Sequence, residues 1–201
     1  ADDNASGIAA LFETARVINE INYQPKRTIE FVAFAAEEMM YSLSCLSGSE
    51  YYAQQCDSLS RNIICMINND MIGYNEGEWE IGISQFSGSC FATNLAASIA
   101  IEYTDLELDL FEESDGFADC EPLWNIGIPS VYIMETEFNP GYHSIADTIG
   151  AMDFSYCAEM IKTTIGSIIA VSNEVNILDS PNIKPAYLSD NFVYPNPFID
   201  K

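Results

Sequence analysis

Residues 28–38 read TIEFVAFAAEE, an apolar run that ends in two adjacent carboxylates, Glu37 and Glu38. The run places β-branched and aromatic residues on both faces of an extended chain, which is typical of a strand that is buried on both sides. A carboxylate that is buried without a partner costs several kcal/mol. The run therefore predicts a buried strand whose end needs a cation to compensate two negative charges.

Apolar strands of this kind alternate with helices along the whole chain. Further strands are predicted at 62–70, 78–84, 106–111 and 128–135, and helices at 7–21, 49–59, 90–103, 122–127 and 154–175. Asn4 or Ser6 can cap the first helix. The alternation predicts an α/β fold in three layers, α/β/α, around a central, mostly parallel (mixed) sheet.

The length of 201 residues is enough for one sizeable core. We expect one domain over residues 1–178 and a linker over 179–201, where four of the eight prolines lie without a helical period. Nothing at the start has the pattern of a signal peptide, and the chain enters a helix almost at once. We therefore expect an internal piece of a longer protein that lacks its first strands.

The charge is strongly acidic, with 31 Asp and Glu against 7 Lys and Arg and a net charge of −24. Phosphates would be repelled, so we expect no nucleic-acid partner and no anionic membrane partner. No apolar run reaches the roughly 18–20 residues that a membrane helix needs, so no membrane insertion is expected. The simplest reading of the charge is solubility, although an acidic surface also attracts metal cations and the positive ends of peptides.

The six cysteines form no Cys-x-x-Cys pair, so their spacing does not indicate a zinc ribbon. Cys45 and Cys56 flank a polar loop and are the best candidates for a disulfide. Cys65 lies in a predicted core strand, which favours a buried free thiol.

Acidic residues follow the first two predicted strands, and acids also precede the first helix. In open α/β sheets the active site forms at the carboxyl ends of the strands. Carboxylates combined with an imidazole suit zinc. The residues that the topology would bring to this edge are Asp3, Glu37, Glu38, Asp70 and the only histidine, His143.

Each of these signals also has an ordinary structural explanation. Asp2 and Asp3 can interact with a helix dipole, a single loop histidine is most often a surface residue, and Asp70 can be a turn residue. The Glu37–Glu38 pair is the exception, because a buried strand delivers it and no Lys or Arg lies nearby in the sequence.

Five segments resemble the family of co-catalytic zinc aminopeptidases, which is related to the glutaminyl cyclases. They read ADDNASGIAALFETARVI, FVAFAAEE, INNDMIGYN, DCEPLWNIGIPSVYIMETE and NPGYHSIADTI, in that order, over roughly residues 1–175. The resemblance implies that Asp3 bridges two zinc ions, that Glu38 and His143 complete the protein ligands of one zinc, and that Asp70 binds the other.

The resemblance also implies roles for residues that do not bind metal. Glu37 matches the general base that takes a proton from the zinc-activated water, and Tyr142 matches a tyrosine that stabilises the oxyanion in some members. Asp147 matches a position that orients the histidine loop. With Glu37 as base and Glu38 as zinc ligand, the zinc ion would be the cation that compensates the two adjacent negative charges.

Three features depart from the family pattern. The second zinc of the family also needs a histidine from an upstream His-x-Asp motif, which residues 1–201 do not contain. The segment after Glu38 is longer than usual by about five residues, and Cys120 stands where the family has a histidine. The last two features bear on substrate preference and on activity.

The segment VYPNPFIDK resembles the start of the sorting domains of proteins exported by the type IX secretion route. This would place the protein outside the cell or on the bacterial surface, whereas a plain linker to another domain is the alternative. The sequence predicts a secreted zinc aminopeptidase acting on peptides. A single-zinc glutaminyl cyclase, or an inactive binding or assembly protein of the same fold, stays open. The oligomeric state is not predicted.

Overall fold

A computed structural model describes residues 1–39, 46–112 and 118–173. Its centre is an open sheet of four strands in the order β1-β4-β2-β3. The β1–β4 and β2–β3 pairs are parallel, and β2 and β4 pair antiparallel. The strands are β1 (Met66–Asn69), β2 (Glu80–Gln85), β3 (Glu107–Glu112) and β4 (Ser130–Met134).

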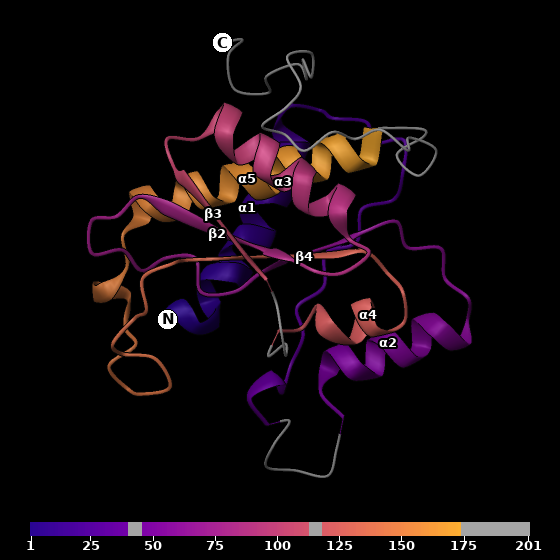
Figure 1. Ribbon diagram of the computed structural model, residues 1–201, viewed down its shortest axis with the longest axis horizontal. Helices are drawn as coiled ribbons and strands as arrows, with labels where there is room; N and C mark the ends of the chain where they lie inside the picture. The colour runs from indigo at the N-terminus through magenta and orange to yellow at the C-terminus, as the bar shows by residue number, and fades with distance from the viewer. Residues whose placement is uncertain (40–45, 113–117, 174–201) are drawn as a thin grey trace.

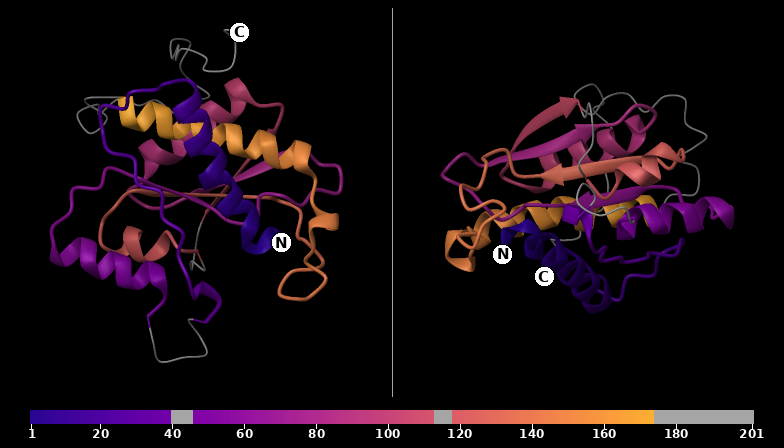
Figure 2. Two further views of the ribbon diagram at one scale, coloured as in Figure 1. Left: turned by 180° about the vertical axis from the view of Figure 1, so that it is seen from behind. Right: turned by 90° about the horizontal axis from the view of Figure 1, so that it is seen from below.

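Helices cover both faces of this sheet (Figures 1 and 2). One face packs against α1 (Gly7–Glu20), α3 (Cys90–Tyr103) and α5 (Phe154–Asn173). The other face carries α2 (Gly48–Ser58) and α4 (Glu121–Asn125), which contact each other. The predicted α/β/α architecture with a mixed sheet is therefore confirmed. In the described part of the chain, no helix combines the length and the apolar character that crossing a membrane requires.

The main core lies between the sheet and the layer of α1, α3 and α5. Small residues let α3 approach its neighbours closely, since Ala92, Ala96 and Ala100 are almost completely buried. Gly166 of α5 faces Ile99 of α3, and a Cβ there would lie 2.5 Å from the Ile99 Cγ2 atom. Glycine at this position therefore permits the close packing of α5 on α3.

Local sequence signals explain several helix ends. Ser47 caps α2 through a capping box, in which its hydroxyl accepts from the Glu50 amide at 3.2 Å and the Glu50 carboxylate accepts from the Ser47 amide at 2.7 Å. Before α1, the Asn4 Oδ1 atom accepts from the Gly7 amide at 2.9 Å, as expected for one of the two candidate caps. The observed helices α2, α3 and α5 closely follow the helices predicted at 49–59, 90–103 and 154–175, of which residues 174–175 lie outside the described part of the chain.

The prediction of a strand at residues 28–36 is wrong for the described structure. No strand is formed there, and most of its apolar side chains are half-buried or exposed. Within the described ranges, the only backbone hydrogen bond to this segment comes from the Gly48 amide to the Ala35 carbonyl, at 2.8 Å. A strand needs a partner as well as suitable side chains, and this segment has no paired neighbour in the part of the chain that the structure describes.

The second predicted strand is shortened for a similar reason. Its partner β4 begins at Ser130, which pairs with Met66, so the ladder starts four residues later than the predicted start at 62. Cys56 is buried with a free thiol, so the candidate disulfide is not formed; its proposed partner, Cys45, lies outside the described residues. Cys65 is a free thiol as predicted, although it is only half-buried.

The ends of β1 and β4 are tied together next to the predicted site. The Asp70 amide donates to the Ile133 carbonyl at 3.3 Å, and the Glu135 amide donates to the Met71 carbonyl at 2.8 Å. The side chain of Glu135 is 1% exposed and accepts from the Tyr74 amide at 2.7 Å. Burial raises the pKa of the Glu135 carboxyl to about 9, and the Asp2 carboxylate nearby adds to this effect.

We predict that Glu135→Gln removes a pH-dependent part of the stability. An acid whose pKa is raised on folding binds more protons in the folded state. The contribution of Glu135 to the free energy of unfolding is therefore complete below the ordinary glutamate pKa of 4.5, and it is lost as the pH rises toward about 9. Urea unfolding across this range should show wild type losing up to ~1.4 kcal/mol per pH unit relative to the variant.

The matched control is Glu107→Gln, which changes an exposed glutamate of β3. This variant should keep the wild-type pH profile. Identical profiles for wild type and Glu135→Gln would contradict a neutral, buried Glu135.

Candidate metal centre

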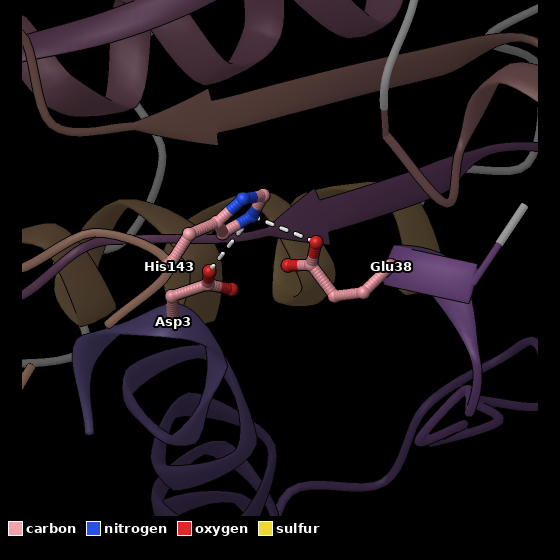
Figure 3. A group of neighbouring side chains, drawn as sticks. All are labelled: Asp3, Glu38 and His143. Atoms are coloured by element: carbon pink, nitrogen blue, oxygen red, sulfur yellow. Dashed lines mark ion pairs between the residues drawn. The ribbon is translucent and has the colours of Figure 1, made fainter. Parts of the chain in front are cut away.

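Three separate segments bring Asp3, Glu38 and His143 together (Figure 3). Asp3 lies in the turn before α1, Glu38 in a short helical turn at Glu37–Met39, and His143 in the loop after β4. The His143 Nε2 atom is 2.7 Å from Glu38 Oε2 and 3.6 Å from Asp3 Oδ2. Each residue offers one ligand atom, and these atoms all lie within 4.8 Å of one another.

The turn that carries Asp3 is held by hydrogen bonds from two sides. Asp147, which follows His143 by four residues, accepts from the Asp2 amide at 3.0 Å and from the Asp3 amide at 3.1 Å. On the other side, the Asn4 Nδ2 group donates to the Asn69 carbonyl at the end of β1, at 3.0 Å. The histidine loop, the Asp3 turn and the end of β1 therefore form one connected frame.

Aromatic packing orients the histidine. The rings of Tyr142 and His143 are stacked, with centroids 3.7 Å apart, and Phe138 packs edge-on against Tyr142 at 4.7 Å. His143 itself has a left-handed backbone conformation, with φ of 55°. Ala36 and Met71, which adjoin Glu37 and Asp70, also have positive φ, at 65° and 53°. Such backbone strain in non-glycine residues is found preferentially at functional sites.

The carboxyl groups around this centre raise one another's pKa. Burial, followed by the charge of Glu38, raises the pKa of Asp3 to about 6. Burial and the charge of Glu38 also raise the pKa of Glu37 to about 7. Asp70 is shifted further, to a pKa of about 8, by burial and then by the charges of Asp3 and Glu37. None of the ion pairs among the described residues joins a Lys or Arg to Asp3 or Glu38.

Asp119 is a further acidic residue at the site, and the sequence reasoning did not select it. It contributes to the raised pKa of both Glu37 and Asp70, and burial raises its own pKa. One of its oxygens is buried without a hydrogen-bond partner in the described structure. The sequence signal for it is the acid in the segment ADCEPLW, directly before Cys120, which stands where the family has a histidine.

The donor set fits a zinc ion. Two carboxylates and one imidazole are ligands that zinc accepts, and their ligand atoms are close enough to surround one ion. Asp70 lies outside this group of three, although its Oδ1 atom is buried and has no hydrogen-bond partner among the described residues. Such an oxygen next to Asp3 and Glu37 is a suitable donor for a cation.

The centre is open to solvent. Glu38 and His143 each have side chains that are 49% exposed, whereas Asp3 is 15% exposed. A cavity of about 590 Å³ adjoins the three ligands, and Ser144, Ile145 and Asp147 complete its lining. The arrangement can hold a cation and present it to a molecule that enters from the surface.

Residues 1–167 match the model of Peptidase family M28, and the chain therefore belongs to this family. The resemblance to zinc aminopeptidases that the five motifs indicate is confirmed at the level of the family. The roles of the individual site residues stay predictions, supported by the convergence described above.

Two curated relatives illustrate the match. Leucine aminopeptidase 1 of Ajellomyces capsulatus is 27% identical over 181 residues, which covers 84% of this chain and 46% of the relative. The probable leucine aminopeptidase of Arthroderma otae is 30% identical over 173 residues, which covers 83% of this chain and 46% of the relative. The chain thus spans about half the length of the curated relatives that it matches.

Solved structures agree with this fold. The LapA aminopeptidase of Legionella pneumophila has a TM-score of 0.77 and 25% identity, with 87% of this chain and 47% of that chain covered. BSAP, a zinc aminopeptidase from Bacillus subtilis, has a TM-score of 0.72 and 24% identity, with 86% of this chain and 42% of that chain covered. The second similarity bears on the fold alone.

We predict that Asp147→Asn weakens metal binding. The amide of asparagine can present only one acceptor oxygen to the two backbone amides that the carboxylate now holds, so the turn carrying Asp3 would loosen. Loss of such a supporting contact typically costs ~10–100-fold in metal affinity. Competition with a chromophoric zinc chelator measures this directly on the full-length protein.

Asp105→Asn is the control for the loss of one negative charge, because Asp105 is exposed and lies in the loop after α3. It should bind zinc as wild type does. Equal affinities for the Asp147 and Asp105 variants would show that Asp147 does not support the centre.

Proposed function

We propose that this chain forms the catalytic part of a zinc-dependent aminopeptidase that removes N-terminal residues from peptides. The observation that carries the proposal is the convergence of Asp3, Glu38 and His143, from three distant segments, beside a second carboxylate, Glu37. The names of the curated relatives support aminopeptidase activity, and the family membership supports peptide hydrolysis.

Asp3, Glu38 and His143 would hold one zinc ion, and Asp70 would contribute to a second one that shares Asp3. Zinc supplies Lewis-acid polarisation of the peptide carbonyl and activation of water. The protein's own contribution is to fix the ligands: Asp147 and Asn4 anchor the turn of Asp3, and stacking with Tyr142 sets the ring plane of His143.

Glu37 would act as the general base and acid. Its carboxyl group is partly buried at the site, close enough for Asp3, Glu38 and Asp119 to influence its pKa, but it is not one of the three grouped ligands. A carboxylate in this position can take a proton from water and pass it to the leaving amine. The hydroxyl of Tyr142 is the candidate donor to the developing oxyanion.

The surroundings of the centre suit a peptide N-terminus. The negative charges of the site attract an ammonium group. Ile145, which is fully exposed, gives the cavity an apolar wall that could pack against the first side chain of a peptide. We further propose secretion or attachment to the bacterial surface, on the basis of the VYPNPFIDK segment, which lies outside the described residues.

One observation favours a second candidate, a single-zinc glutaminyl cyclase. The structure groups three ligands and leaves Asp70 outside that group, which is what a one-zinc centre would need. The aminopeptidase remains the principal proposal, because the relatives are named as aminopeptidases. Assays on an aminoacyl anilide and on a peptide with N-terminal glutamine distinguish the two activities.

We predict that Glu37→Gln and Glu38→Gln fail in different ways. The amide in Glu37→Gln cannot accept a proton, so the full-length variant should keep its zinc while kcat falls by ~10²–10⁴. Glu38→Gln replaces an anionic ligand with a neutral one and should lose zinc. Metal analysis after dialysis and steady-state kinetics with an aminoacyl anilide measure both effects.

The two variants are matched controls for each other, because each removes one charge at neighbouring positions. If Glu37→Gln loses zinc as readily as Glu38→Gln, the two roles are assigned the wrong way round. If wild type hydrolyses no aminoacyl substrate and Glu37→Gln changes nothing, the protein is a binding or assembly protein of the same fold.

We also predict that removal of metal abolishes the activity reversibly. A chelator should lower kcat/KM of the full-length enzyme by at least ~10²-fold, because the polarisation of the carbonyl is lost. Added zinc should restore it, whereas magnesium should not, since an imidazole-containing site favours zinc. Full activity after exhaustive chelation would contradict a metal-dependent reaction.

A further inference from the structure

The loop that carries His143 is a compact unit over residues 139–147. The amide and the hydroxyl of Ser144 both donate to the Gly141 carbonyl, at 3.0 and 2.7 Å. A Cβ atom on Gly141 would lie 2.8 Å from the carbonyl carbon of Ala146, so glycine lets the two arms of the loop approach closely. These contacts give the loop its shape, but they do not fix its position relative to the other metal ligands.

Asn139 lies at the base of this loop and is buried between two acids. The residue is 1% exposed. Its Nδ2 group donates to Asp2 Oδ2 at 3.3 Å and to Asp147 Oδ1 at 3.2 Å. Its Oδ1 atom accepts from the Gly141 amide at 2.8 Å. An asparagine amide offers two N–H donors and an acceptor oxygen, so both of its functions are used here.

The two acids that Asn139 joins each adjoin a metal ligand. Asp2 immediately precedes Asp3, and Asp147 follows His143 by four residues. Asp147 also accepts from the amides of Asp2 and Asp3. The Asp3 Oδ2 and His143 Nε2 atoms lie 3.6 Å apart (Figure 3). Asn139 therefore lies where the Asp3 turn meets the histidine loop, and it contacts both.

The charge of these surroundings explains why an uncharged donor suits this position. Asp2 is fully buried, and its other carboxylate oxygen accepts from the Gly73 amide at 2.9 Å. A further acid, Glu135, lies close to Asp2 as well. Carboxylates that approach each other in a buried place repel unless a donor lies between them. Asn139 supplies that donor without a positive charge, which would repel a metal cation next to it.

We propose that Asn139 is a positioning residue of the metal centre, which holds the Asp3 turn and the histidine loop at the separation that one zinc ion requires. It acts by donating to Asp2 and Asp147 at the same time, and it is not one of the three grouped ligands. The inference rests on the proposed zinc centre. The competing explanation is a plain turn residue, whose only task is to accept from the Gly141 amide.

The variant Asn139→Asp in the full-length protein separates the two explanations. Aspartate has the same shape and keeps an acceptor for the Gly141 amide, but it replaces the donor with a charged oxygen that faces Asp2 and Asp147. We expect zinc affinity, measured by competition with a chromophoric chelator, to fall by ~10–100-fold, as for other residues that support metal ligands. An added negative charge alone would attract zinc. Weaker binding therefore reports lost positioning, and unchanged or tighter binding would overturn the proposal.

Asn19→Asp is the matched control for the added charge. Asn19 is exposed and lies near the end of α1 that is remote from Asp3. This variant should bind zinc as wild type does, and an equal loss of affinity in both variants would overturn the proposal. If wild type itself binds no zinc in this assay, the proposed centre fails and the inference fails with it. If wild type and Asn139→Asp bind zinc equally, only the positioning role fails.

Exchanging the two partners gives an independent test, which also applies if Asn139→Asp alone fails to fold. In the double variant Asp2→Asn/Asn139→Asp, the amide and the carboxylate change places and the net charge is that of wild type. A hydrogen bond between the two positions is then possible again, and the amide oxygen at position 2 can still accept from Gly73. We expect the double variant to bind zinc within ~10-fold of wild type and more tightly than Asp2→Asn alone. A double variant that binds zinc no better than Asp2→Asn, or that does not fold, would overturn the proposal, because a plain turn residue predicts no coupling between the two positions.

Discussion

The crowding of acidic side chains from the turn before α1, the turn at Glu37–Met39 and the end of β1 is the constraint on which the candidate site depends. Burial raises the pKa values of Asp3, Glu37 and Asp70, and the charges of neighbouring carboxylates raise them further. His143 is the only basic side chain that pairs with them in the described structure. A divalent cation resolves this repulsion better than any arrangement of these side chains alone.

The frame that maintains this crowding explains why distant segments depend on each other. Asp147 fixes the backbone of Asp2 and Asp3, and Asn4 fixes the same turn to the end of β1. Glu135, whose carboxyl pKa is raised by burial, adds a buried contact that connects the end of β4 to the loop after Asp70. These contacts connect the candidate centre to β1 and β4 at its base, while the side chains of Glu38 and His143 stay half exposed at the surface.

The sequence predicted those features that local pattern and motif determine. Helical periodicity located α2, α3 and α5. The expected strand and helix ends, together with the family motifs, pointed to Asp3, Glu37, Glu38, Asp70 and His143, and the structure groups Asp3, Glu38 and His143. Features that depend on distant partners were missed. Residues 28–36 have the side chains of a buried strand but no paired neighbour among the described residues, and Asp119, just before α4, comes close to Glu37 and Asp70 through the tertiary fold. Neither fact is contained in a local pattern.

The central claim is that Asp3, Glu38 and His143 share one zinc ion. Diffraction at the zinc absorption edge, from crystals of the full-length protein grown near neutral pH with zinc, tests it most directly. The account predicts an anomalous peak at about 2.0–2.2 Å from one ligand atom of each of the three residues. A well-ordered site with no anomalous peak next to His143 would contradict it.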